Sequence, residues 1–213
     1  MQLKVDPQWT ALATARAARL VAGAEGPAVS GRRTLAPCCS RHDDPAMGTA
    51  AVRRQREASS IAHARRLFLD DEHANGCAES ALVVLKEAFG LPDAADSSAA
   101  IALNGGVAYS GGICGAISGS AIAVGQLVAA RVADHATAKR TAREIVAGLM
   151  DEFEAEFGSV DCRALLGRDI RTPEAHAAFI RSGIWRTACM AQLEFVIRRL
   201  SRSLDEPTVG SAG

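Results

Sequence analysis

The chain has 213 residues, with 24 basic and 24 acidic side chains and therefore a formal net charge of zero. A general nucleic-acid binder, or a protein that binds anionic membranes, carries an excess of basic residues, so neither class fits. Hydrophobic residues make up 48% of the chain and aromatic residues only 4%, so a core must be built mainly from Ala, Leu, Val and Ile. These values are typical of one globular domain with a tail.

Residues 1–46 differ in composition from the rest of the chain. They contain prolines and scattered glycines but no long apolar period, which is typical of a loop-rich or disordered extension. Met47 then opens a sequence of helical character, and we expect the natural chain to begin there. Residues 11–24 are rich in alanine, but Arg16 and Arg19 interrupt the apolar run that a secretory signal needs, which favours a cytoplasmic protein.

Apolar residues recur at helical spacing through the rest of the chain, and Gly, Pro and Asn mark the breaks. No strand pattern appears. We therefore predict an all-α, compact single-domain helical bundle of about six to eight helices over 47–204, with a frayed tail at 205–213. The predicted helices are 50–70, 76–89, 97–103, 113–132, 135–157, a short one ending at Gly167, one from Pro173 capped by Thr172, and 185–204.

The fourth predicted helix needs a separate test, because residues 113–130 carry no charge and just reach the length of a membrane span. Its glycines, serines and Gln126 lower its hydrophobicity, so a buried helix of a bundle is favoured over a membrane span. Gly111, Gly115 and Gly119 recur every four residues and are expected to share one face, where a neighbouring backbone can approach closely.

Cysteine is the residue type that carries chemistry in this chain. Cys77, Cys114 and Cys162 each follow a glycine turn or a capping residue at a predicted helix start. The free N–H groups and partial positive charge there favour a thiolate, so we expect lowered pKa values for these thiols. Cys189 lies within the last predicted helix, and such a position, taken alone, is typical of a core residue. Two further cysteines, Cys38 and Cys39, lie in the extension.

Four glycines stand close to these thiols and are candidate cofactor-binding positions. They are Gly76, Gly112, Gly115 and Gly119. Glycine lets a partner sulfur, a metal or a substrate come near, because it has no side chain to block the approach.

The spacing of the cysteines leaves three kinds of function open. Cys77, Cys114, Cys162 and Cys189 form neither the CxxC of structural zinc and thioredoxin-type sites nor the CxxCH of covalent haem. If the fold gathers them, they can serve as catalytic thiols in dithiol/disulfide pairs, or as ligands of an iron–sulfur cluster or other metal. The third alternative is a non-catalytic helical module in which the cysteines merely pack.

Five short motifs, in order, resemble the bacterial and archaeal C-GCAxxG-C-C family of redox-active proteins. They are NGCAESAL (75–82), NGG (104–106), CGAISG (114–119), CRALLG (162–167) and the late Cys189. The resemblance covers about residues 60–200. It implies a redox role for the four cysteines, with a redox partner protein or a small-molecule thiol or disulfide as the reaction partner. Many relatives carry a further cysteine where this chain has Arg168, so a five-thiol scheme is not expected here.

Overall fold

The computed structural model describes residues 45–72 and 74–203. Contacts divide the chain into two units, Met1–His42 and Asp43–Gly213, and all described residues belong to the second. The predicted extension, with Cys38 and Cys39, and the predicted tail lie outside the described residues apart from 45 and 46, so their disorder stays a prediction.

Helices account for the regular structure of the described ranges, where no strand occurs, and the all-α prediction is confirmed. Two short 3₁₀ turns, η1 (Ser98–Ala100) and η2 (Ile184–Arg186), join the α-helices. The α-helices are α2 (Pro45–Phe68), α3 (Cys77–Ala88), α4 (Gly115–Arg131), α5 (His135–Phe157), α6 (Cys162–Leu166), α7 (Pro173–Ser182) and α8 (Ala188–Ser203).

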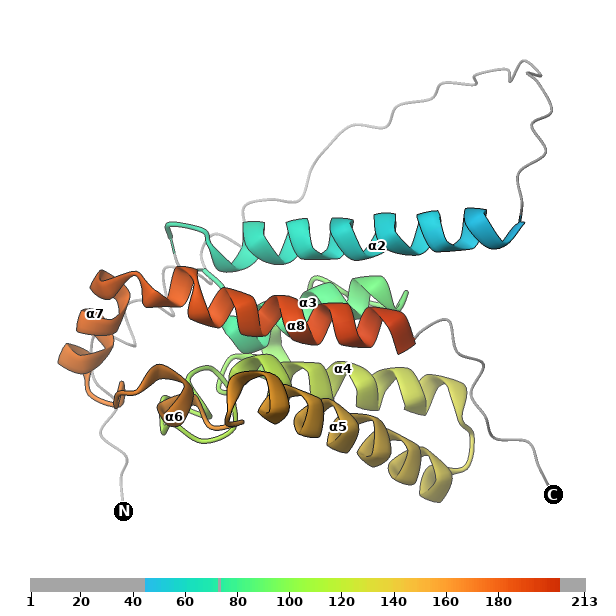
Figure 1. The fold of residues 1–213 in the computed structure, drawn as a ribbon. Coiled ribbons are helices and arrows are strands. Elements are labelled where there is room, and N and C mark those ends of the chain that lie inside the picture. Colours follow the sequence, from blue (N-terminus) through green and yellow to red (C-terminus); the bar gives the residue numbers. More distant parts are fainter. Residues whose placement is uncertain (1–44, 73, 204–213) are drawn as a thin grey trace, which may run out of the picture. The chain divides into compact units, whose positions relative to one another are not determined.

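The helices of this unit form three layers around α3 and α8 (Figure 1). Helix α3 packs on α2, α4 and α8, and α8 packs in addition on α5. In the figure α2 lies on one side of the α3–α8 pair, and α4 and α5 lie on the other. Helix α3 is consequently buried along almost its whole length.

Aliphatic and phenylalanine side chains fill the space between the layers, as the composition predicts. Leu82 and Leu85 of α3 and Leu193 and Ile197 of α8 are fully buried. Each such side chain contributes roughly 1.5–3 kcal/mol through removal of apolar surface from water. Within the described residues no helix is long and apolar enough to cross a membrane, and α4, which carries no charge before Arg131, packs inside the bundle as predicted.

Capping residues set several helix ends where the sequence predicts them. The side chain of Thr172 accepts a hydrogen bond from the backbone N–H of Ala175 (3.2 Å), and Pro173 is the first residue of α7. The side chain of Asp134 accepts from the N–H of Thr137 (2.8 Å) and caps α5. Both caps satisfy N–H groups that have no partner within the helix.

Three predicted helices differ from the structure. The first begins at Pro45 rather than Ala50, so residues 45 and 46 of the predicted extension are helical. The third is only the 3₁₀ turn η1, which ends before Leu103. The last helix begins at Ala188 rather than Trp185, because η2 intervenes after Gly183, which has a left-handed φ of 69°. The indole Nε1 of Trp185 donates to the carbonyl of Ile180 (3.2 Å) and ties η2 to α7. This break moves Cys189 to the second residue of a helix.

Candidate functional site

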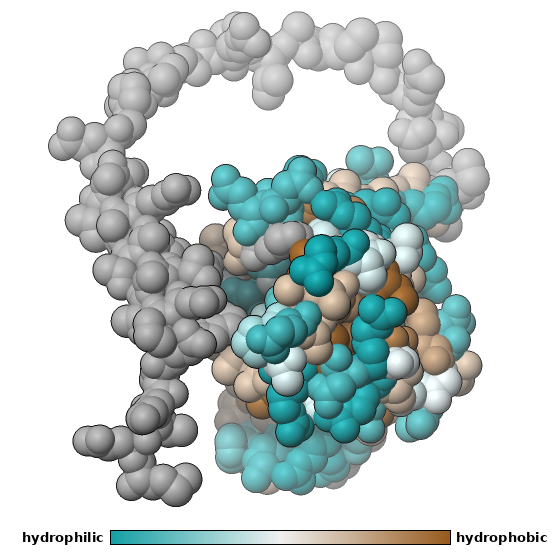
Figure 2. Space-filling model, turned by 90° about the vertical axis from the view of Figure 1, so that its left-hand side faces the viewer, coloured by the Kyte–Doolittle hydropathy of each residue, from teal (hydrophilic) through white to brown (hydrophobic). Residues whose placement is uncertain are grey.

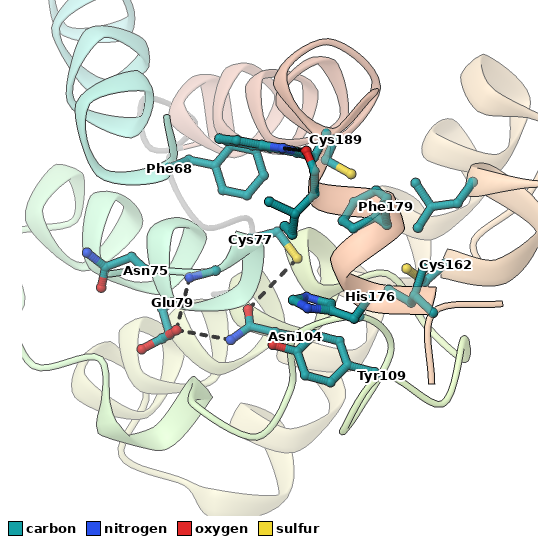
Figure 3. A pocket seen from close by; sticks show the side chains of 16 residues that line it. Phe68, Asn75, Cys77, Glu79, Asn104, Tyr109, Cys162, His176, Phe179 and Cys189 are labelled. Carbon is teal, nitrogen blue, oxygen red and sulfur yellow. Dashed lines mark hydrogen bonds between the residues drawn. The ribbon is translucent and has the colours of Figure 1, made fainter. Parts of the chain in front are cut away.

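Four helix starts carry the four cysteines of the described region, and three of these cysteines, Cys77, Cys162 and Cys189, lie around one pocket (Figure 3). Cys77 is the first residue of α3, Cys114 the N-cap of α4, Cys162 the first residue of α6, and Cys189 the second of α8. Cys77, Cys162 and Cys189 line one cavity of about 180 Å³. Cys114 is buried and interacts electrostatically with the other three. All four are free thiols.

Glycines of α4 allow the start of α3 to lie directly against α4. A Cβ added at Gly115 would lie 2.4 Å from Sγ of Cys77, and one at Gly119 would lie 2.1 Å from the carbonyl oxygen of Ala78. Real Cβ atoms do not come so close to other atoms, so both positions need glycine. The predicted close backbone approach is confirmed for this pair. Gly111 does not share that face, because it precedes α4 and lies against Arg163.

Backbone hydrogen bonds tie the start of α4 to the start of α6. The N–H of Cys114 donates to the carbonyl of Val160 (2.8 Å), and the N–H of Cys162 donates to the carbonyl of Gly112 (2.7 Å). Ile113 and Asp161 form the antiparallel bridge between them. Cys114 and Cys162, 48 residues apart in sequence, are thereby held near each other by main-chain contacts that do not depend on their side chains.

Asn104 caps α3 from a distant part of the chain. Gly76 stands at the N-cap of α3 but has no side chain to accept a hydrogen bond. The side chain of Asn104 occupies that space instead: its Oδ1 accepts from the N–H of Ala78 (3.0 Å) and lies 3.9 Å from Sγ of Cys77. Gly76, a predicted cofactor-binding residue, thus makes room for Asn104 and also lines the cavity.

A buried carboxylate completes this network. Glu79 is only 4% exposed, and its Oε2 accepts from the N–H of Gly76 and from Nδ2 of Asn104, each at 3.0 Å. Its Oε1 accepts from Oγ of Ser97 (3.3 Å). The carboxylate is therefore satisfied by three donors, as a buried charge requires. It holds Asn104 beside Cys77.

The loop after Asn104 makes a left-handed turn of five residues. Residues 105–109 all have positive φ, and three of them, Val107, Ala108 and Tyr109, are not glycine. Such residues each cost roughly 1–2 kcal/mol in this conformation. Hydrogen bonds from the N–H of Ala108 to the carbonyl of Ala102 (2.8 Å) and from Gly111 to Gly105 (3.0 Å) hold the turn. Backbone strain of this size is often found at functional sites.

The strained turn places Tyr109 at the cavity, where its ring packs against His176 of α7 with centroids 4.6 Å apart. Burial raises the pKa of Tyr109, and the negative charges of Cys77 and Glu79 raise it further. His176 also lines the cavity (Figure 3). Sequence reasoning missed His176 and the role of Asn104, because their partners are remote in the chain and no local spacing signals them.

Gln192 of α8 is the polar neighbour of the innermost thiol. It is buried, and its Oε1 lies 3.6 Å from Sγ of Cys114, within range of an S–H donor. A buried amide and a buried thiol thus lie together on the side of the site where α4 and α8 meet.

Burial raises the pKa of all four thiols above the ordinary value of 9.0. Around Cys77, backbone N–H groups lower the pKa, but burial outweighs them. Burial and then the negative charge of Cys77 raise the pKa of Cys162 to about 12. The expectation that helix starts would lower these pKa values is therefore wrong. Loss of water disfavours the thiolate more than a helix start favours it.

A labelling experiment checks whether the pKa of Cys162 is raised. We expect Cys162 of the folded chain to react with iodoacetamide near pH 8 about a thousandfold more slowly than in the urea-unfolded chain, because a pKa of about 12 leaves that much less thiolate. The rate should rise roughly tenfold per pH unit toward that pKa. Mass spectrometry of the peptide that contains Cys162 measures both rates. A folded-state rate that levels off near pH 9 would contradict the raised pKa.

No three or more His, Cys, Asp or Glu side chains within 45–72 and 74–203 are arranged so that they could hold a metal ion. The iron–sulfur or metal hypothesis for Cys77, Cys114, Cys162 and Cys189 thus stays a prediction. Iron and acid-labile sulfide analysis of the anaerobically purified chain tests it. Two of the predicted cofactor-binding glycines take part in main-chain contacts: the carbonyl of Gly112 accepts from the N–H of Cys162, and Gly119 lies against the backbone of Ala78.

The fold and the site together define an all-α bundle protein whose thiols gather at helix starts. The family model described as Putative redox-active protein (C_GCAxxG_C_C) matches residues 76–201, and the chain belongs to this family. The matched range contains all four cysteines of the site, and the resemblance seen in the sequence motifs is confirmed. No curated protein and no solved structure matches the chain.

Proposed function

We propose that this protein is a thiol redox protein in which Cys77 exchanges with disulfides and a second cysteine of the site resolves the product. One observation carries the proposal: Cys77 is half-buried, whereas the other three cysteines of the described region are buried, and it lines one cavity together with Cys162 and Cys189. Family membership supports a redox role in general.

The proposed reaction has two exchange steps. The thiolate of Cys77 attacks a substrate disulfide, forms a mixed disulfide and releases one substrate thiolate, which takes up a proton. A second protein thiolate then attacks Sγ of Cys77, forms an intramolecular disulfide and releases the second substrate thiol. Two protein thiols are oxidised and one substrate disulfide is reduced. Cys162 and Cys189, which line the same cavity, are the candidates for the second thiol.

Proton removal limits this chemistry, because burial keeps the thiols protonated. His176 lines the cavity with Cys77 and is the base available there for the proton. Its ring orientation is set by packing against Tyr109 and Phe179. We expect the exchange to proceed only when the disulfide occupies the cavity.

A thiol count after mild oxidation tests the proposal. The full chain carrying Cys38→Ser and Cys39→Ser is used, so that only the four cysteines of the site are counted. We expect oxidation to remove two thiols per chain while the helical circular dichroism is retained, and peptide mapping to place Cys77 in the new disulfide. A matched variant that also carries Cys77→Ser should form a disulfide much more slowly than the protein that retains Cys77.

Two results would overturn the proposal. One is a disulfide that forms equally fast without Cys77. The other is a chain whose thiols stay reduced under oxidants that act on the urea-unfolded chain. In the second case the cysteines serve packing, and replacement of all four by serine should change only the free energy of unfolding.

A further inference from the structure

The cavity beside Cys77 has an apolar wall. Seven side chains supply it from the end of α2, the left-handed turn, and the segments around α6, α7 and η2. They are Phe68, Tyr109, Leu166, Ile170, Phe179, Ile180 and Trp185. At about 180 Å³ the space is slightly larger than the roughly 150 Å³ engineered cavity that accommodates benzene. A molecule of a few heavy atoms fits, whereas a peptide does not.

No Lys or Arg is among the described residues that line this cavity. Besides the three thiols, its ionisable side chains are Glu79, Tyr109 and His176. Glu79 is buried and already accepts three hydrogen bonds from protein donors, so little of its acceptor capacity is left for a cationic ligand. Its negative charge also disfavours an anionic one.

Figure 2 shows the end of the unit that carries α7, where hydrophilic side chains surround narrower hydrophobic patches. A charged molecule at this surface is well hydrated. Transfer of its charge to a largely apolar cavity without an ionic partner is costly, whereas an uncharged molecule of the same size gains from the transfer.

From this lining we infer that the cavity selects small, uncharged disulfides as the oxidant of Cys77 and rejects charged ones. The inference rests on the proposed function and specifies its substrate class. The overall reaction is the oxidation of two protein thiols to one disulfide with reduction of the small disulfide to two thiols. Each released thiol carries one proton away from the site.

Three disulfides of different charge test the selection on the full chain with Cys38→Ser and Cys39→Ser. They are 2-hydroxyethyl disulfide, which is neutral, cystamine, which is cationic, and dithiodiglycolate, which is anionic and of similar size. The rate of thiol loss with each is divided by its rate with the urea-unfolded chain, which removes differences in intrinsic reactivity. We expect the normalised rate of the neutral probe to exceed the other two at least about tenfold, the factor that about 1.4 kcal/mol of selectivity produces.

A charge placed in the wall should change the ratio of the two charged probes' rates. Ile180→Lys adds a cation to the lining and is expected to raise the normalised rate of dithiodiglycolate at least about threefold while the cystamine rate falls. Ala178→Lys is the matched control, because Ala178 is exposed on the same helix and is not part of the lining. If Ile180→Lys does not fold, Asn75→Lys at the polar rim replaces it, with Ala74→Lys as control.

The outcomes separate the two proposals. Equal normalised rates for the three probes, or a faster charged probe, overturn the selection and leave the redox function in place. If none of the probes oxidises the folded chain, the redox function itself falls. Faster reaction of the neutral probe with an unchanged ratio of the dithiodiglycolate rate to the cystamine rate in Ile180→Lys and Asn75→Lys also overturns the selection, since the wall then does not control it.

Discussion

Replacement of Gly119 by alanine is expected to lower the free energy of unfolding by about 3 kcal/mol. The new Cβ would lie 2.1 Å from the carbonyl oxygen of Ala78 and within 3.0 Å of its Cα. These are backbone atoms of α3, so no side-chain rotation relieves the contact and the two helices must separate. Since α3 is the central helix, its displacement should lower the stability of the whole bundle. Urea denaturation followed by circular dichroism measures it.

Gly125→Ala provides the control within the same helix. A Cβ at Gly125 has no atom within 4 Å, so alanine there should stabilise the protein by roughly 0.5–1 kcal/mol through its higher helix propensity. Opposite signs for the two variants would separate the packing effect from the propensity effect. A Gly119→Ala protein as stable as Gly125→Ala would show that α3 and α4 do not lie as close as described.

The second large effect is expected for Asn104→Ala. This change removes the acceptor for the N–H of Ala78, the donor to the buried Glu79, and the contact with Sγ of Cys77. Loss of partners for a buried charge and a helix start should lower the free energy of unfolding by about 2–3 kcal/mol. Hydrogen exchange in the first turn of α3 should become faster, and so should alkylation of Cys77, because its sulfur is no longer held.

Asn75→Ala is the matched control, because it removes another amide at the same cavity. We expect it to change stability by less than about 0.5 kcal/mol, as is usual away from buried networks. Equal effects of the two variants on exchange and on alkylation would contradict the positioning role of Asn104.

The site depends on contacts of two kinds that act together. Glycines let α3 approach α4, and Asn104 with Glu79 holds the start of α3 where that approach puts it. The strained turn at 105–109 lies between these elements in the chain and carries Tyr109 to the cavity. A strained turn beside this group of thiols is costly for a module that only packs, and this favours a functional site.

Helix positions followed well from the sequence, because apolar periodicity and caps are local signals. The cap Thr172 with Pro173, the long helix from His135 and the helix starts at Cys77 and Cys162 all agree with the structure. The start of the last helix was missed, since η2 depends on the packing of Trp185 against α7. That error concealed the fact that Cys189, too, stands at a helix start.

The sequence by itself determined the all-α class, the identity of the four thiols, the position of three of them at helix starts, and the family. Only the tertiary structure decided that three of these thiols line one cavity, that Asn104 and His176 belong with them, and that burial raises the pKa values of the thiols. The reason is physical. Helix propensity and capping act over a few residues, whereas burial and hydrogen bonding between distant segments arise only when the helices pack.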